Sequence, residues 1–267
     1  YDDPLLHPPE ARPSSDFLVV ESTYGARVHA PDDARDSIAA VVRRTVARHG
    51  VVVMPAFAVG RAQLLLYHLR ALLDAGSIPR VPIFLDSPLA AAVTRLVPHH
   101  RSELKLSDAR IRGLLDVCTI TESAEESKRL DQSGGPMIII SASGMATGGR
   151  VVHHLKRFAP DSKSSVLFAG FQAAGTRGAK MLHGAESVKI HGEYFPVRAE
   201  LHNLSMLSAH ADTDEIMRWL RNFQRPPRKV FLVHGEPEAA DTLRLRIKDE
   251  LGWSCDVAEH LQTVELP

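Results

Sequence analysis

The stretch "VVVMPAFAVGRAQLLLYHLRALLDAG", residues 51–76, contains the repeating unit that decides the fold class. Its first part, 51–57, is a continuous apolar run rich in valine, which is typical of a strand covered on both faces. Residues 60–76 then predict a helix. A strand followed by a helix is the crossover unit of a parallel sheet, so this stretch predicts an α/β fold.

The same alternation extends along most of the chain. Further strands are predicted at 17–22, 81–87, 117–121, 136–143 and 165–170. Helices are predicted at 32–50, from residue 88, at 123–132 and from residue 149, and a polar region at 101–116 is also helix-like. The pattern therefore predicts a largely parallel sheet with helices on both faces.

The pattern changes near residue 187. The segment "SVKIHGEYFPVRAELHNLSML", residues 187–207, alternates apolar and polar residues around a Gly-Glu pair. This alternation favours an antiparallel hairpin over a crossover unit. A helix at 212–224, a strand at 229–236, a helix at 237–251 and a strand at 255–265 follow. The change at 187–207 is the best candidate for a domain boundary.

Composition limits the function classes. Lys plus Arg and Asp plus Glu number 32 each, so the formal charge is zero and any basic surface must be local. The two cysteines lack metal-type spacing and are too few for a disulfide framework, which favours a reducing, cytoplasmic setting. The apolar stretches are too short and interrupted for a membrane span.

Polar residues follow several predicted strands, at the sheet edge where ligands gather in open α/β folds. Glu21, Asp86 and His234 each end such a strand, and "SASGMATGGR" (141–150) follows another. The glycines and hydroxyls of this segment suit a phosphate cradle, but a turn that merely needs small residues accounts for them equally well. Arg61 could contact a phosphate at a helix start, although a solvated first-turn arginine is the favoured interpretation.

Two histidines differ from the rest. His210 in "MLSAHADTDE" (206–215) and His234 each lie beside small residues at the edge of an apolar segment. His153 and His154 are adjacent, so on a helix they point about 100° apart and at most one faces a site. Zinc needs at least three protein ligands, and the sequence contains neither HxHxDH nor HExxH. The residues therefore leave open a hydrolytic site with ligands from elsewhere or a phosphate-binding module without chemistry.

Seven segments, taken in order, resemble the metallo-β-lactamase/β-CASP family, which contains RNA-processing and RNA-degrading nucleases. The form "GMATGGR" is typical of its bacterial and archaeal branch. The segments are "LHPPEARPSSDFLVVESTYG", "MPAFAVGRAQLLLYHL", "FLDSPLA", "IIISASGMATGGRVVHHL", "LFAGFQAAGTRGAKML", "LSAHAD" and "VFLVHGEPEAADTLRLRI".

The resemblance implies an architecture in which a parallel-sheet β-CASP domain is inserted into a metallo-β-lactamase αββα sandwich. Residues 1–25 would end the first metallo-β-lactamase segment, 26–207 would form the β-CASP domain, and 208–267 would return to the metallo-β-lactamase domain. The family's HxHxDH motif precedes the point at which this chain begins. We therefore expect the chain to be the C-terminal portion of a longer protein.

The resemblance also implies roles for individual residues. Glu21 in "ESTYG" matches the acid of family motif A, His210 in "SAHAD" matches motif B, and His234 in "VHGE" matches motif C. His234 would coordinate zinc, whereas His210 and Glu21 would lie beside the metals and deliver the proton to the leaving group. Asp212 could orient this pair or simply begin the next helix, and the second role is favoured.

The implied activity is zinc-dependent hydrolysis of RNA phosphodiester bonds. Two zinc ions are expected in the complete protein, with most ligands outside this chain, so the chain alone is expected to be inactive. The implied cleft admits single-stranded RNA, and a homodimer is an open alternative to a monomer. The expected substrate-binding residues are Ser143, Gly144, Thr147, Gly149, Arg150 and Arg61. Alternatives are a catalytically inactive RNA-binding scaffold and another phosphoester substrate.

Overall fold

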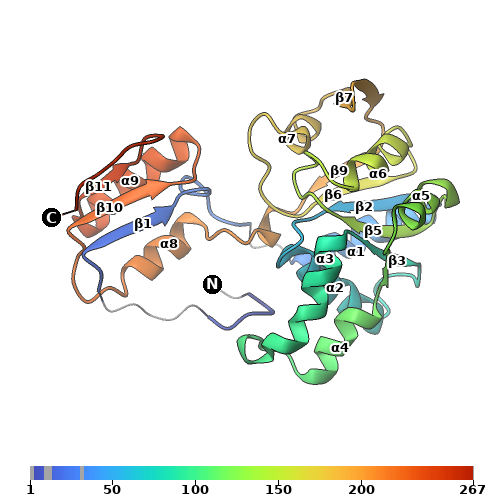
Figure 1. The fold of residues 1–267 in the computed structure, drawn as a ribbon, viewed down its shortest axis with the longest axis horizontal. Helices are drawn as coiled ribbons and strands as arrows, with labels where there is room; N and C mark the ends of the chain where they lie inside the picture. Colours follow the sequence, from blue (N-terminus) through green and yellow to red (C-terminus); the bar gives the residue numbers. More distant parts are fainter. Residues whose placement is uncertain (1–2, 9–13, 31–32, 267) are drawn as a thin grey trace. The chain divides into compact units, whose positions relative to one another are not determined.

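A computed structural model describes residues 3–8, 14–30 and 33–266 (Figure 1). The described residues form two compact units, each of which has its own core. The terminal unit contains residues 14–30 and 210–266, and the central unit contains 33–209 together with 4–7. The predicted domain boundaries after residues 25 and 207 stay predictions, because they were assigned by family resemblance and these units are defined by contacts.

The central unit is built on a six-stranded sheet in the order β4-β3-β5-β2-β6-β9, in which every pairing is parallel. The strands are β2 (Val51–Pro55), β3 (Ile83–Asp86), β4 (Thr119–Ile120), β5 (Met137–Ser141), β6 (Ser165–Phe168) and β9 (Glu200–Asn203). The predicted α/β class and the parallel sheet are confirmed.

Seven α-helices accompany this sheet among the described residues. They are α1 (Ala34–Ala47), α2 (Arg61–Asp74), α3 (Pro88–Leu96), α4 (Asp108–Asp116), α5 (Ala124–Ser133), α6 (Val151–Phe158) and α7 (Arg177–Leu182). A 3-10 helix, η1 (Val97–Glu103), takes up the start of the region 101–116, so the α-helix predicted there begins only at residue 108. The helix α7 was not predicted.

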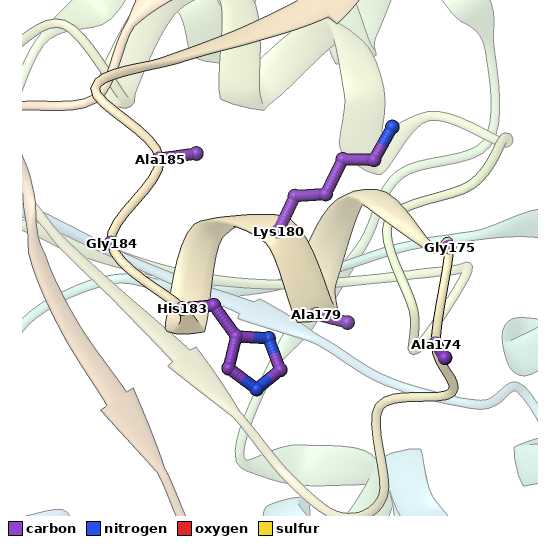
Figure 2. Close-up of a pocket in the computed structure, with 7 residues that line it drawn as sticks. All are labelled: Ala174, Gly175, Ala179, Lys180, His183, Gly184 and Ala185. Carbon is purple, nitrogen blue, oxygen red and sulfur yellow. The ribbon is translucent and has the colours of Figure 1, made fainter.

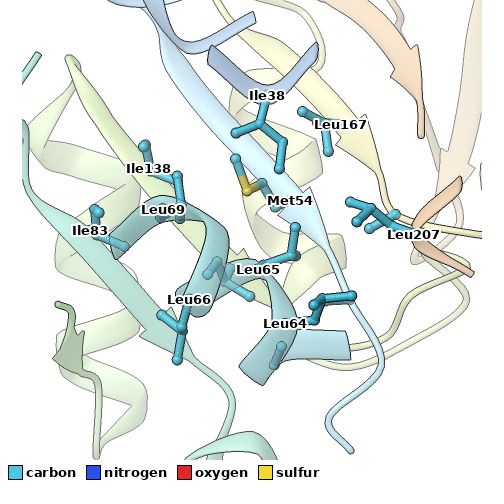
Figure 3. Close-up of a cluster of buried hydrophobic side chains, with 14 of the residues drawn as sticks. Ile38, Met54, Leu64, Leu65, Leu66, Leu69, Ile83, Ile138, Leu167 and Leu207 are labelled. Atoms are coloured by element: carbon cyan, nitrogen blue, oxygen red, sulfur yellow. The ribbon is translucent and has the colours of Figure 1, made fainter. Parts of the chain in front are cut away.

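The central strand β2 shows why helices cover both faces of the sheet. Successive side chains of a strand point to opposite faces. Val52 and Met54 accordingly pack in a core with residues of α1 to α4, part of which Figure 3 shows, including Ile38 and Leu65. Residues 51 and 53 pack in a second core with residues of α5 to α7. The continuous apolar run of β2 is therefore required by burial on both sides.

The segment 187–207 folds only partly as predicted. Strands β7 (Ser187–Ile190) and β8 (Glu193–Pro196) form the expected antiparallel hairpin. Its turn is His191-Gly192, one residue before the predicted Gly-Glu pair, and both residues have positive φ, 48° and 88°, as a two-residue type I′ turn requires. The strand β9 was wrongly included in the hairpin, because it pairs in parallel with β6 and extends the main sheet.

The terminal unit contains a parallel three-stranded sheet in the order β1-β10-β11. The strands are β1 (Phe17–Glu21), β10 (Lys229–Val233) and β11 (Cys255–Val257), and the helices are α8 (Thr213–Leu220) and α9 (Pro237–Leu251). A 3-10 helix, η2 (Ser205–Leu207), closes the central unit before them. The predicted helix 237–251 is confirmed, whereas the strand predicted at 255–265 ends at residue 257.

The core of the terminal unit forms where the two helices meet the sheet. Val20 of β1 and Val230 and Leu232 of β10 pack with Met217 of α8 and Leu243 of α9. The loops that follow β1 and β10 lie outside this core. In the part of the chain that the structure describes, no helix combines the length and the apolar character needed to cross a bilayer.

Replacing Leu65 by alanine tests the packing of the central core. Leu65 is 0% exposed on α2, so Leu65→Ala should lower the free energy of unfolding by about 2–5 kcal/mol, through lost transfer energy and the cavity left behind. Urea unfolding measures this change. Leu89→Ala is the matched control, because Leu89 is 61% exposed on α3 and its loss should change stability by less than about 0.5 kcal/mol. Equal losses in the two variants would contradict the assignment of this core.

Candidate functional site

Strand pairing brings Glu21 and His234 together. The two strands β1 and β10 are parallel neighbours, and Glu21 pairs with Val233, the residue just before His234. His210 lies just before α8, and its Nδ1 is 3.3 Å from Oε1 of Glu21. The rings of His210 and His234 stack with centroids 5.3 Å apart. The structure thus assembles the three residues predicted from motifs far apart in the sequence.

The tight turn after β10 accounts for the pair His234-Gly235. His234 has a φ of 59°, in the left-handed region that favours glycine. A Cβ at Gly235 would lie 2.3 Å from the hydroxyl of Ser22 and 2.6 Å from its carbonyl oxygen. Only glycine therefore fits at residue 235, where the turn passes directly against the loop that follows β1.

Thr23 connects the two histidines and was missed by the sequence analysis. Its hydroxyl donates to the carbonyl oxygen of His234 at 3.0 Å. Having used its hydrogen, Oγ1 can only accept from the nearby ring nitrogens, Nδ1 of His234 at 3.1 Å and Nδ1 of His210 at 3.4 Å. This arrangement favours the tautomer of His234 that carries its proton on Nδ1 and leaves a lone pair on Nε2. The sequence offered one indication of this role, namely a hydroxyl residue two positions after Glu21 in the same loop.

Glu21 is held as a carboxylate. Burial raises its pKa, but hydrogen bonds from His210 and from the backbone N–H of Thr23, 2.8 Å from Oε2, outweigh burial and lower the pKa below its usual value. Oε1 accepts from Nδ1 of His210. This contact engages Nδ1 of His210 and does not involve its Nε2.

Asp212 begins α8, as favoured from the sequence. Its side chain accepts from the backbone N–H of Glu215 and the Glu215 side chain accepts from the backbone N–H of Asp212, both at 2.9 Å, which forms a capping box. Asp212 also accepts from the backbone N–H of His29 at 2.8 Å. The structure therefore gives this buried acid a helix-capping role.

His29 is a second residue that the sequence analysis missed. Its Nε2–H donates to the carbonyl oxygen of His210 at 2.9 Å. The Tyr24 ring packs against both histidines, with centroids 4.8 Å from His29 and 6.5 Å from His210. These contacts fix the backbone of His210 from the loop after β1. No local pattern indicated this role, because it depends on contacts between segments distant in sequence.

The segment 141–150 lies in the central unit, and much of its composition serves the turn itself. The hydroxyl of Ser143 accepts from the backbone N–H of Thr147 at 3.1 Å. A Cβ at Gly144 would lie 2.7 Å from the Phe57 ring, and one at Gly149 would lie 2.3 Å from the carbonyl oxygen of residue 142. Close packing thus accounts for these small residues, and their contacts with phosphate stay predictions.

The two arginines predicted to bind substrate are both engaged by the protein. Arg150 forms an ion pair with Asp86 at 2.7 Å and donates to the carbonyl oxygen of Thr121 at 3.1 Å. Arg61 is only 5% exposed, so the favoured interpretation of a solvated first-turn arginine is wrong. The reason is that the first two turns of α2, residues 61–66, are entirely buried. Whether Arg61 contacts phosphate stays a prediction.

A buried charged cluster surrounds His154 in the central unit. Its Nε2 is 2.6 Å from Asp86 and its Nδ1 is 2.6 Å from Asp131, so both nitrogens donate and the ring is positively charged. Burial lowers the pKa of His154, but the hydrogen bonds to Asp131 and Asp86 outweigh it and raise the pKa to about 9. Burial raises the pKa of Asp86, yet hydrogen bonds from His154, Ser127 and Arg150 hold it below its usual value. This cluster ties β3 to α5 and α6.

A hollow of about 410 Å³ lies beside α7, and the polar side chains that line it do not point toward one another (Figure 2). Its only polar side chains are Lys180 and His183, and they point to opposite sides of the helix. The remaining lining consists of alanines and glycines. It therefore presents no constellation of side chains for chemistry.

Comparisons with known proteins match both units. Residues 62–181 match the model of the Beta-Casp domain, and residues 190–258 match that of the Zn-dependent metallo-hydrolase RNA specificity domain. A ribonuclease of Thermus thermophilus is 38% identical over 88% of this chain and 54% of its own length. The transcription termination factor FttA of Pyrococcus horikoshii is 32% identical over 98% of this chain and 42% of its own length. The chain thus spans about half the length of the curated relatives it matches.

The pH dependence of stability tests the cluster around His154. Because the folded-state pKa of about 9 exceeds the ordinary 6.5, the stabilisation by His154 is complete below pH 6.5 and is lost as the pH rises through about 9. The difference in unfolding free energy between wild type and His154→Gln should therefore shrink from about pH 6 to about pH 10 in urea titrations. His153→Gln, an exposed change on the same helix, should show no such decline. A constant difference for His154→Gln would contradict a charged ring.

Proposed function

Because this chain belongs to the metallo-β-lactamase/β-CASP family, we propose that it forms part of a zinc-dependent enzyme that hydrolyses RNA phosphodiester bonds. The observation that carries the proposal is the grouping of Glu21, His210 and His234, whose donor atoms lie within 4.8 Å of one another. One matched relative is named a ribonuclease and another a transcription termination factor, which supports RNA as the substrate class.

His234 fits a zinc ligand, because imidazole is a ligand type that zinc takes in catalytic sites. Glu21 and His210 are instead bonded to each other beside it. His234 in particular suits coordination, because Thr23 holds its Nδ1–H and leaves Nε2 with a lone pair. When bound, zinc would activate a water molecule for attack on phosphorus and neutralise charge on the phosphate. One histidine ligand cannot hold two ions, so we propose that most ligands come from outside this chain and that the chain alone is inactive.

The proposed role of His210 is proton delivery. Its Nδ1–H donates to the Glu21 carboxylate, and the negative charge of Glu21 can balance a positive charge on the ring. A proton on Nε2 can then pass to the leaving ribose oxygen, which needs one when the phosphodiester bond breaks. Thr23 and His29 position the two histidines, and Asp212 holds the start of α8. These residues act through hydrogen bonds, without contacting substrate.

In the central unit, we propose that the segment 141–150 positions the RNA strand. The backbone N–H groups of Gly144 and Gly149 can bind phosphate, and Ser143 and Thr147, whose own N–H groups bond within the turn, can contribute their hydroxyls. Such contacts fix the strand without reading its sequence. The side chain of Arg150 would act indirectly, by tying this segment to Asp86. Single-stranded RNA is the expected partner.

Substitution of His210 tests the proposed role in proton delivery. His210→Ala in the full-length protein should lower kcat on single-stranded RNA by about 10²–10⁴-fold, because the leaving oxygen loses its proton donor. The bound zinc should not change. His260→Ala, an exposed histidine of the same unit, should retain wild-type kcat. Full activity in His210→Ala would refute the role, and RNA binding without hydrolysis in the zinc-loaded wild type would favour the inactive scaffold.

Substitution of Thr23 tests the tautomer of His234. Thr23→Val removes the acceptor for Nδ1–H at nearly constant volume, so the affinity for zinc should fall by about 10–100-fold. Thr23→Ser keeps the hydroxyl and should bind zinc like the wild type. Competition with a chromophoric chelator measures both affinities, and circular dichroism checks folding. Unchanged affinity in Thr23→Val would show that this hydrogen bond does not prepare His234 for the metal.

A further inference from the structure

A groove in the central unit lies between α2 and α4 and carries four arginines. A hollow of about 530 Å³ is lined by Arg35, Arg70 and Arg110, together with Tyr67. An adjoining hollow of about 250 Å³ is lined by Arg80 and again by Arg70. The two hollows share Arg70 and Asp74 in their linings, and we call them together the arginine groove.

Small residues keep the groove open. Ala71 of α2 and Ala109 and Gly113 of α4 line the larger hollow. A Cβ at Gly113 would lie 3.8 Å from Cγ of Arg70, so the aliphatic part of Arg70 passes over this glycine. The small side chains on facing sides of the two helices therefore leave space that the arginines border.

The groove carries an excess of positive charge. The acids that line it are Asp74 and Asp116, which leaves four positive charges against two negative ones. Arg70 donates to Asp74 at 2.9 Å, whereas Arg80 and Arg110 form no ion pair with any residue in the described ranges. In a chain with a formal charge of zero, this excess marks the groove as a place for an anionic partner.

Tyr67 adds a flat apolar surface to this charge. Arg35 donates to the Tyr67 hydroxyl at 3.1 Å, and its guanidinium carbon lies 5.4 Å from the centre of the ring. The arginine thereby holds the half-buried ring in place at the border of the groove. A row of cationic groups beside an aromatic ring is the arrangement that proteins use for single-stranded nucleic acid, whose phosphates and bases alternate along the strand.

We propose that the arginine groove binds the phosphodiester backbone of single-stranded RNA, with a base packed against the pair formed by Arg35 and Tyr67. Two neighbouring hollows bordered by four arginines suit an extended polyanion better than a lone phosphate. The groove belongs to a different unit from Glu21, His210 and His234, and none of these three residues lines it. The choice of RNA as the polyanion rests on the proposed function.

Charge reversal at two arginines tests the groove. Arg35 and Arg110 lie in the first turns of α1 and α4, where an acid interacts favourably with the helix dipole, so Arg35→Glu with Arg110→Glu should preserve folding. Binding of a labelled oligouridylate is measured without metal, so that no hydrolysis occurs. The double variant should bind at least about tenfold more weakly, and the slope of log affinity against log salt should fall by about 1.4 for two lost phosphate contacts.

Arg112→Glu is the matched control. Arg112 is an exposed residue of α4 that does not line the groove, so its reversal changes the net charge on the same helix without touching the site. It should change RNA affinity by less than about twofold per charge reversed, as an effect of overall charge alone. Equal weakening by Arg112→Glu, or no weakening by the double variant, would overturn the proposal.

This binding test is independent of the proposed catalysis. Loss of binding in the double variant of a protein that fails to hydrolyse RNA would support the groove and refute the nuclease. Hydrolysis that depends on His210, combined with wild-type binding by the double variant, would support the nuclease and overturn the groove.

Discussion

The parallel pairing of β1 with β10 is the contact on which the whole candidate site depends. It joins two segments from opposite ends of the chain in a fixed register, with Glu21 opposite Val233. From that register follow the approach of Gly235 to Ser22 and the hydrogen bonds from Thr23 to His234. A shift of one residue would turn Glu21 to the other face of the sheet and remove it from His210. The grouping of these side chains is therefore a consequence of backbone pairing.

Strands buried on both faces were the elements that the sequence predicted best. A continuous apolar run as short as that of β2 is typical of a buried strand, and the order of such runs along the chain predicted the parallel sheet. The strand β9, "ELHN", was misassigned because it is a polar edge strand whose partner lies elsewhere in the sequence. Arg61 was misjudged for a related reason, since the burial of a helix start depends on what packs over it.

The sequence indicated only those site residues that lie in motifs of the family. Glu21, His210 and His234 were identified through the family resemblance, and the structure brings them together. Thr23, His29 and His154 were not, because their roles depend on single hydrogen bonds between distant segments. Such bonds leave no periodicity, and a hydroxyl or an imidazole is common in loops and helices that have no function. The sequence therefore indicated which three residues lie together better than it indicated the hydrogen bonds around them.

Although the formal net charge of the chain is zero, its charged side chains form one balanced cluster and one with an excess of positive charge. Around His154, two cations and two carboxylates are held together and balance one another. Along the arginine groove, four cations meet only two acids. The first arrangement stabilises the protein and has no charge to offer a ligand, whereas the second keeps its charge available.

The backbone of His234 has a consequence for how this protein can evolve. A residue with a Cβ in the left-handed region costs about 1 kcal/mol or more relative to glycine, and asparagine is also better tolerated there than histidine. Retention of histidine therefore works against local conformational preference. A lineage without need of this imidazole would gain stability by replacing His234 with glycine or asparagine, so the residue at this position reports whether the imidazole is used.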